Sequence, residues 1–178
     1  MKKRLLLIPA LLFVFLTGCA SGKIHEKSYL RAAAVSGEEG RSLVLAFFDE
    51  DTAVESFGEN MDDSVKKAGL KAGKPVFTGY TELVIIDGTD CRELLVHILN
   101  EWKVSPSCIV AYCGNGEKLL KEGDSEKLIG AAKQAVEQGI APECDIITVL
   151  GKLCNGRTAE IAELYADGTA GSHIIYQF

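Results

Sequence analysis

A glycine-containing segment over residues 113–118 has residue types that could bind an anion. Cys113-Gly114-Asn115-Gly116-Glu117-Lys118 falls where a buried strand is expected to give way to a helix. Backbone N–H groups in such a turn, assisted by Lys118, could hold an anion. A phosphate-binding Walker loop needs its two glycines farther apart and a Ser or Thr after the Lys. Because both features are missing and Glu117 would repel phosphate, we interpret the segment as a tight turn between strand and helix.

Carboxylates gather at two places and raise the question of a calcium site. One group is Asp49-Glu50-Asp51 with Glu55, and the other is the pair Asp62-Asp63. Carboxylate oxygens are the ligands that Ca²⁺ prefers, but the spacing of an EF-hand loop is absent. The sequence therefore favours a solvated loop and helix face at both places.

Thiols and imidazoles are plentiful but poorly arranged for metal binding. No C-x-x-C occurs, and no His lies near a Cys at metal-ligand spacing. Five cysteines follow Cys19, an odd number that cannot all pair within one chain. We expect free thiols, with one disulfide or a metal site as the alternatives. The residues concerned are Cys91, Cys108, Cys113, Cys144 and Cys154, with His25, His97 and His173.

A predicted helix beginning after Asp90 carries the two remaining catalytic candidates. Asp90 and Glu93 have the spacing of a capping box, with Asp in place of Ser or Thr. Cys91 falls in the first turn, where a thiol can be reactive, but no partner base is in view. His97 lies off the apolar face of the helix, so we expect it at the surface or the edge of the core. G-x-S-x-G, H-E-x-x-H and G-x-G-x-x-G are all absent, so the sequence gives no positive sign of an enzyme. A pocket that held Cys91 or His97 beside a carboxylate would revive an enzymatic function.

Length and charge narrow the class further. The 178 residues suit one domain, and 19 basic against 25 acidic residues give a net charge of −6. A nucleic-acid-binding protein needs a basic face, so this acidic balance argues against nucleic acid as a partner.

The N-terminus has the features of a bacterial lipoprotein signal peptide over residues 1–18. A basic start precedes about a dozen apolar residues, and Leu16 to Cys19 resembles a lipobox. This pattern predicts cleavage before Cys19 and attachment of palmitate-like acyl chains to its thiol and new amine, with residues 19–27 as tether. The mature chain would carry a net charge of −9, so acyl chains rather than basic residues must hold it to the membrane. The alternatives are an ordinary signal peptide with a chance Cys, or an uncleaved membrane helix.

Hydrophobic periodicity and turn residues predict the elements that position these groups. We expect a strand pair about the turn at residues 36–40, a helix over 54–68 capped by Gly69, and a strand region over 76–86. A helix over 91–102 and a strand over 108–112 follow. The remaining expected elements are helices over 117–121, 125–136 and 146–153 and a strand pair over 157–165 and 173–178.

This order predicts a single domain over residues 28–178 with an α/β (α+β) fold. Alternation of strand and helix in the middle implies parallel central strands, and the terminal hairpins add antiparallel ones. We therefore expect a mixed β-sheet with helices packed on it.

Several phrases together resemble the N-terminal domain of the Ger(x)C spore germination lipoproteins, the C subunits of germinant receptors. Lys74 to Ile86 is the most specific of them. The family's usual Trp-Asp pair after the lipidated Cys is replaced by Ala20-Ser21, and its later domains have no counterpart here. The other phrases are the lipobox Cys19, Lys23 to Leu30, Cys91 to Trp102, Ile109 to Lys118, Ile146 to Leu153 and Gly168 to Phe178.

The resemblance implies a non-enzymatic protein that is anchored through Cys19 on the extracytoplasmic face of the cell membrane, which is the spore inner membrane in that family. Its partners would be integral membrane germinant receptor subunits, and it would act in spore germination by docking on them. No catalytic or ligand-contacting residue carries over from the family. The alternative is a small-ligand binding lipoprotein that serves a transporter or sensor, with a pocket where the strands end at Ile86 and Tyr112.

Overall fold

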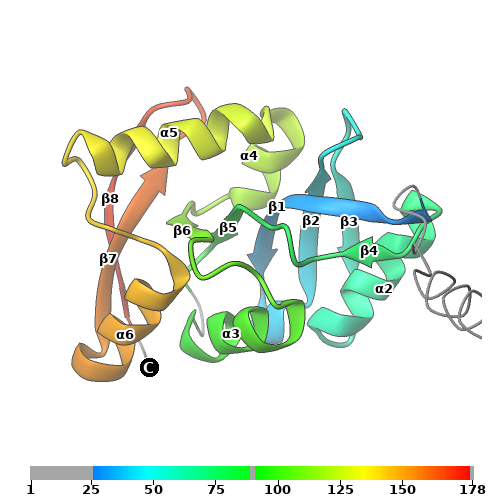
Figure 1. Cartoon of the computed structure of the whole chain (residues 1–178), viewed down its shortest axis with the longest axis horizontal. Helices are drawn as coiled ribbons and strands as arrows, with labels where there is room; N and C mark the ends of the chain where they lie inside the picture. The colour runs from blue at the N-terminus through cyan, green and yellow to red at the C-terminus, as the bar shows by residue number, and fades with distance from the viewer. Residues whose placement is uncertain (1–25, 89–90, 177–178) are drawn as a thin grey trace, which may run out of the picture.

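The computed structural model describes residues 26–88 and 91–176, which form a mixed eight-stranded sheet with helices on both faces (Figure 1). The strand order is β3-β2-β1-β5-β6-β7-β8, with β4 paired to β1. The four central strands run parallel: β1 (Ser28–Ser36), β5 (Leu83–Ile86), β6 (Ile109–Tyr112) and β7 (Thr158–Leu164).

Antiparallel strands complete the sheet on both sides. β2 (Ser42–Phe47) and β3 (Val54–Phe57) follow β1 on one side, and β8 (Ala170–Tyr176) closes the other. These pairings confirm the predicted fold class, with parallel central strands and antiparallel outer strands. They also confirm both terminal hairpins, although the last strand starts three residues earlier than expected.

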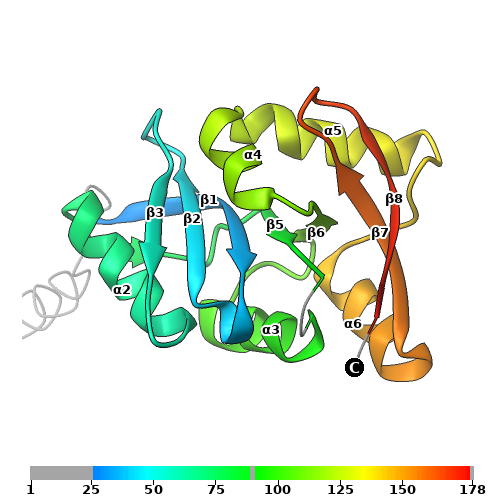
Figure 2. The same ribbon diagram turned by 180° about the vertical axis from the view of Figure 1, so that it is seen from behind.

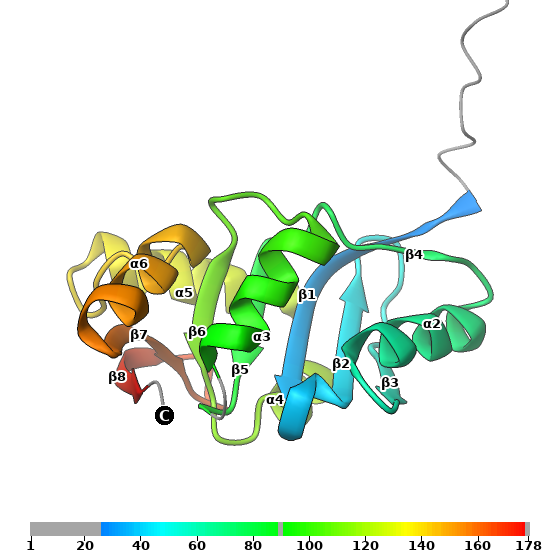
Figure 3. The same ribbon diagram turned by 90° about the horizontal axis from the view of Figure 1, so that it is seen from below.

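Two groups of helices cover the sheet, one on each face (Figure 3). Seen from behind, the β7–β8 hairpin and the β1–β2–β3 side lie at opposite ends (Figure 2). Residues 83–86 are at most 1% exposed, because a parallel strand under two helical layers is covered on both faces. One group is α2 (Met61–Ala72), α3 (Cys91–His97) with its π-helical continuation η3 (Ile98–Trp102), and α6 (Ile146–Gly156); the other is α4 (Gly116–Glu122) and α5 (Ser125–Glu137).

The predicted helix over residues 54–68 is wrong in its first part. Val54 to Phe57 pairs with β2 as an edge strand, and Phe57 is 68% exposed instead of lying in a helical core. The helix starts only at Met61, because the Asn60 side chain accepts the Asp63 N–H at 3.0 Å and caps it there. The spacing of apolar residues suited a helix, but pairing with β2 decided the outcome.

Two smaller expectations also need correction. The helix ends at Gly73 rather than Gly69, since Gly73 takes the left-handed conformation that closes a helix (φ 73°). The single strand region over 76–86 is two strands, β4 (Val76–Phe77) and β5, separated by a turn in which the Thr81 N–H donates to the Thr78 carbonyl. Asp90, the expected helix cap, lies outside the described residues.

The short β4 strand gives one end of the molecule its own architecture. Val76 and Phe77 pair with Ser28 and Tyr29, so the start of β1 and β4 form a two-stranded ribbon beyond the main sheet. The α2 helix lies along this ribbon, as Figures 1 and 3 show. We call this part of the molecule, where β1 begins, the tether end.

Candidate functional site

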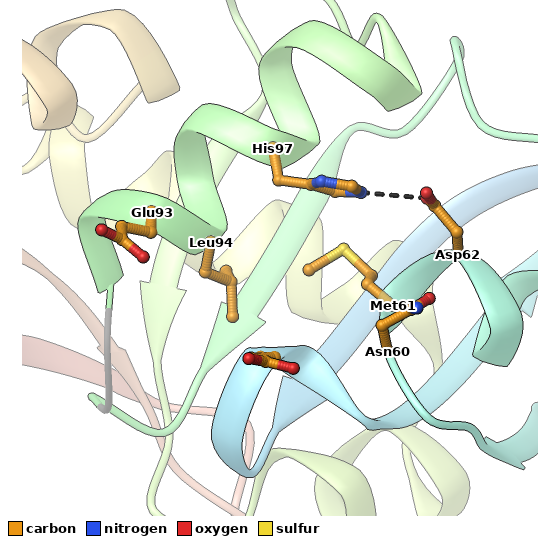
Figure 4. A pocket seen from close by; sticks show the side chains of 7 residues that line it. Asn60, Met61, Asp62, Glu93, Leu94 and His97 are labelled. Carbon is orange, nitrogen blue, oxygen red and sulfur yellow. Dashed lines mark hydrogen bonds and ion pairs between the residues drawn. The ribbon is translucent and has the colours of Figure 1, made fainter.

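A cleft between α2 and α3 gathers charged and polar side chains around an apolar floor (Figure 4). Its volume is about 360 Å³. We call it the His97 cleft. Met61 and Leu94, both buried, form the floor. The full lining is Glu39, Asn60, Met61, Asp62, Glu93, Leu94 and His97.

Helix ends and turns position the polar groups of this cleft. Asn60 caps α2 and so places Asp62 in its first turn. His97 closes α3, and its Nε2 lies 3.0 Å from Asp62 Oδ1 across the gap between the helices. Glu39 stands in a left-handed turn (φ 56°), where Arg41 reaches its carboxylate at 3.4 Å. The sequence placed His97 at the edge of the core, and its side chain is 33% exposed.

The charges in the His97 cleft define what could enter it. Glu39, Asp62 and Glu93 contribute three carboxylates, against one imidazole. Within residues 26–88 and 91–176, no three His, Cys, Asp or Glu side chains converge so as to hold a metal ion. The cleft is therefore suited to a small organic cation with an apolar part, rather than to a metal or an anion.

The segment from Cys113 to Lys118 lies where a ligand of a parallel sheet is often held. The carboxyl ends of β1, β5 and β6 surround a hollow of about 170 Å³, at the place expected for a small-ligand pocket. Two of its polar side chains bind each other, since Ser36 donates to Glu117, and Asp87 accepts from the backbone N–H of Gly37. Asn115 caps the following helix by accepting the Lys118 N–H. The hollow is small and acidic, which suits a turn rather than an anion site.

The described cysteines are all free thiols, and three of them, Cys91, Cys108 and Cys144, are buried in the core. Cys91 is 1% exposed, so a dissolved substrate has no access to it. Burial raises the pKa of Cys108 to about 12 and also raises the pKa of Cys144. Such thiols stay protonated and unreactive. Cys154 is exposed on α6, and Cys113 is half-buried at the end of β6.

The carboxylates of the two clusters considered for calcium form separate hydrogen bonds and ion pairs. Glu50 accepts a hydrogen bond from Ser28, and Glu55 pairs with Lys121 at 2.8 Å. The hydrogen bond from Lys121 lowers the pKa of Glu55. Asp63 pairs with Lys67 on α2, which separates it from its neighbour Asp62 in the His97 cleft. Glu50, Glu55 and Asp63 thus have separate partners, and in the described part of the chain these carboxylates do not converge on a common cation site.

Three further residues considered from the sequence are His173, Cys19 and His25. His173 stacks on Tyr112 with ring centroids 3.6 Å apart and lies 3.8 Å from Glu163. Cys19 and His25 lie outside the described residues. No helix in the described part of the chain is long and apolar enough to cross a bilayer.

Sequence reasoning missed two apolar surfaces at the tether end. One is a groove of about 540 Å³ between α2 and β4, called here the α2–β4 groove. The other is a cluster of aromatic rings around Phe77, which faces the opposite side of the β1–β4 ribbon from Val76 because successive side chains of a strand alternate. The phrase Lys74 to Ile86 held the signal, but only the pairing of β4 with β1 brings these residues together. The groove is lined by Val65, Lys66, Gly69, Leu70, Gly73, Lys74, Pro75 and Val76.

Comparison with known protein families, with curated proteins and with solved structures finds no match for this chain. Function is therefore argued from its motifs and its geometry.

Proposed function

We propose that this chain is a non-enzymatic lipoprotein, anchored through Cys19 on the extracytoplasmic face of the cell membrane, that docks on integral membrane subunits of a germinant receptor. Three features support it: the lipobox-like segment at Cys19, the resemblance to Ger(x)C germination proteins, and an exposed apolar groove on which another protein could dock. In a spore the anchoring membrane would be the inner one.

The α2–β4 groove is the observation that carries this proposal. Leu70 is 82% exposed on α2, the highest exposure of any large apolar side chain in the described residues. It lines the groove together with Pro75 and Val76, and Lys66 and Lys74 contribute basic side chains. An exposed apolar surface with a polar rim is typical of a site where another protein binds.

The position of the groove favours a partner inside the membrane. Val76 in the groove pairs with Ser28, the first residue of β1. A lipidated Cys19 would thus hold this end of the domain close to the bilayer, where receptor subunits are embedded. Within the described residues, Cys108 and Cys144 are buried and protonated, and no Ser, Thr or Cys lines the cleft beside the His97–Asp62 pair, so neither place offers a nucleophile for catalysis.

The experiment is crosslinking and co-isolation of the tagged, full-length protein from spore membranes. We expect multi-spanning receptor subunits to be recovered with the unchanged chain and to be lost with Leu70→Glu. Ile147→Glu is the matched control, because Ile147 is 47% exposed on α6 at the opposite end of the molecule. Equal recovery with both variants, or recovery of transporter components instead, would contradict the proposal.

The His97 cleft favours the alternative function, binding of a small ligand for a transporter or sensor. Its carboxylates and apolar floor suit an organic ammonium ion. Calorimetric titration with a panel of such amines tests this function. Binding that is weakened by Asp62→Asn, while Leu70→Glu leaves it unchanged, would favour the alternative over docking.

A further inference from the structure

Four aromatic side chains gather at the tether end and are called here the aromatic patch: Tyr29, Phe48, Phe77 and Tyr80. The Tyr29 ring lies 5.5 Å from Phe77 and 5.6 Å from Tyr80, and Phe77 meets Tyr80 edge-on at 5.1 Å. Phe48 lines the same cleft as Tyr80. Tyr80 is 61% and Phe48 43% exposed, so packing against the rest of the domain leaves both rings facing solvent.

Cations lie over this patch, but nearby acids balance them. Lys27 Nζ is 5.2 Å from the centre of the Phe77 ring, and the Arg31 guanidinium is 5.1 Å from that of Phe48. Arg31 also pairs with Glu82 at 3.6 Å and Glu126 at 3.3 Å. Glu50 and its acidic neighbours follow Phe48 directly. Attraction to another surface must therefore come from burial of the rings rather than from net charge.

The length of the tether determines what the patch can reach. Residues 20–27 separate Cys19 from the first residue of β1, and fully extended they span about 30 Å. Tyr29 is the second residue of β1, and Phe77 is its partner on β4. A lipid on Cys19 would therefore keep these rings within one short tether of the bilayer, while the far hairpin of β7 and β8 lies at the other end of the molecule (Figure 1).

We propose that the aromatic patch seats itself in the headgroup region of the bilayer and sets the orientation of the domain on the membrane. This inference rests on the lipid anchor of the proposed function. Tyrosine rings with neighbouring lysines are enriched where a protein meets the membrane–water interface, because one end of each side chain is apolar and the other is polar. With the patch in the interface, the α2–β4 groove on the other side of the ribbon stays open to a protein partner.

Fluorescence quenching by brominated lipid tests this contact in the lipidated, full-length protein. Trp102 is the only tryptophan, so Trp102→Phe provides a dark background. Trp102 is buried, and its indole N–H has no hydrogen-bond partner in the described part of the chain, so phenylalanine leaves no acceptor unpaired. Tyr80→Trp reports on the patch, and Tyr176→Trp is the matched control, because Tyr176 is 52% exposed on β8.

In phosphatidylcholine vesicles with bromine near the headgroups, we expect the Trp at position 80 to lose most of its fluorescence and the Trp at 176 to keep it. Equal quenching at both positions, or none at 80, overturns the proposal. Quenching at 80 that requires anionic lipid and disappears in salt overturns it too, because charge would then drive the contact.

Flotation of the same vesicles separates this inference from the proposed function. If the protein floats but the fluorescence of the Tyr80→Trp variant is not quenched, the lipid anchor is supported and membrane contact of the aromatic patch is refuted. Protein that does not float refutes the anchor and with it the patch. Shielding of position 80 only when receptor subunits are present would make the patch a protein-binding surface and overturn the lipid assignment.

Discussion

Most polar side chains described in this protein are engaged by a close neighbour, which limits the chemistry that any one of them could do. His97 contacts Asp62, Glu55 pairs with Lys121, and Ser36 binds Glu117. Burial keeps the thiols of Cys108 and Cys144 protonated. At the scale of single residues, these contacts secure the fold rather than prepare a reaction.

Asp145 is the residue whose contribution to stability should follow pH. It caps α6 by accepting the Thr148 N–H at 3.0 Å. Burial opposes ionisation of this carboxyl, but hydrogen bonds from Thr148 and from backbone N–H groups outweigh it and lower its pKa. A lowered pKa stabilises the fold above the ordinary carboxyl pKa, and this stabilisation is lost as pH falls through the folded-state value. We expect Asp145→Ala to cost about 1 kcal/mol at pH 7, and less in acid.

Urea unfolding at a series of pH values from 7 down to 3 measures this change. Asp145→Asn is the control, because its amide oxygen keeps a cap without a charge. The free-energy difference between the Asn and Ala variants should stay constant with pH. A difference between the unchanged chain and Asp145→Ala that grows in acid would contradict the assignment.

Helix α4 and the central sheet meet without room for a side chain between them. Gly116 is the first residue of α4, and a methyl group there would lie 2.7 Å from Ile85 Cγ2 and 3.6 Å from Ala34 Cβ. Ile85 is fully buried, so a methyl group at position 116 would force a shift within the packed core. We therefore expect Gly116→Ala to destabilise the fold by about 1–3 kcal/mol, measured by urea unfolding. The glycine that looked like part of an anion-binding loop is explained by this close contact.

Gly130 gives the matched control for that substitution. It lies within α5, and nothing is within 4 Å of the place a methyl group would take. Gly130→Ala should therefore stabilise the protein by about 0.5–1 kcal/mol, since alanine favours the helix. If both variants shifted stability in the same direction, close packing at Gly116 would not be the reason for its glycine.

Secondary structure was predictable wherever a local pattern and the tertiary context agreed. The apolar runs that became β5 and β6 are buried on both faces, and a run of apolar residues indicates this directly. β3 was missed because its identity depends on pairing with β2, whereas the spacing of Val54, Phe57 and Met61 suits a helix. The His97 cleft was missed because the contact between His97 and Asp62 joins two helices 35 positions apart.

At the scale of the whole molecule, two candidate binding surfaces lie at one end, and the sequence alone did not reveal them. The α2–β4 groove and the aromatic patch both lie at the end where β1 begins, and the pairing of β4 with β1 brings their residues together. No local pattern reports a two-residue strand that pairs across more than forty positions. The predicted lipobox at Leu16 to Cys19, by contrast, rests on a purely local pattern and needs no structure to be proposed.

Anchoring through Cys19 makes a prediction about the whole molecule. Cys19→Ser removes the thiol that receives the lipid, so we expect the intact mass to lack acyl chains and the protein to leave the membrane fraction on washing. The aromatic patch alone should hold it only reversibly, because stable anchoring takes more than one weak apolar contact.

Cys154→Ser is the matched control, since Cys154 is exposed on α6. This variant should keep the mass of the acyl chains and stay in the membrane fraction. An unchanged, wash-resistant membrane fraction with Cys19→Ser would mean that an uncleaved N-terminal segment, not a lipid, holds the domain.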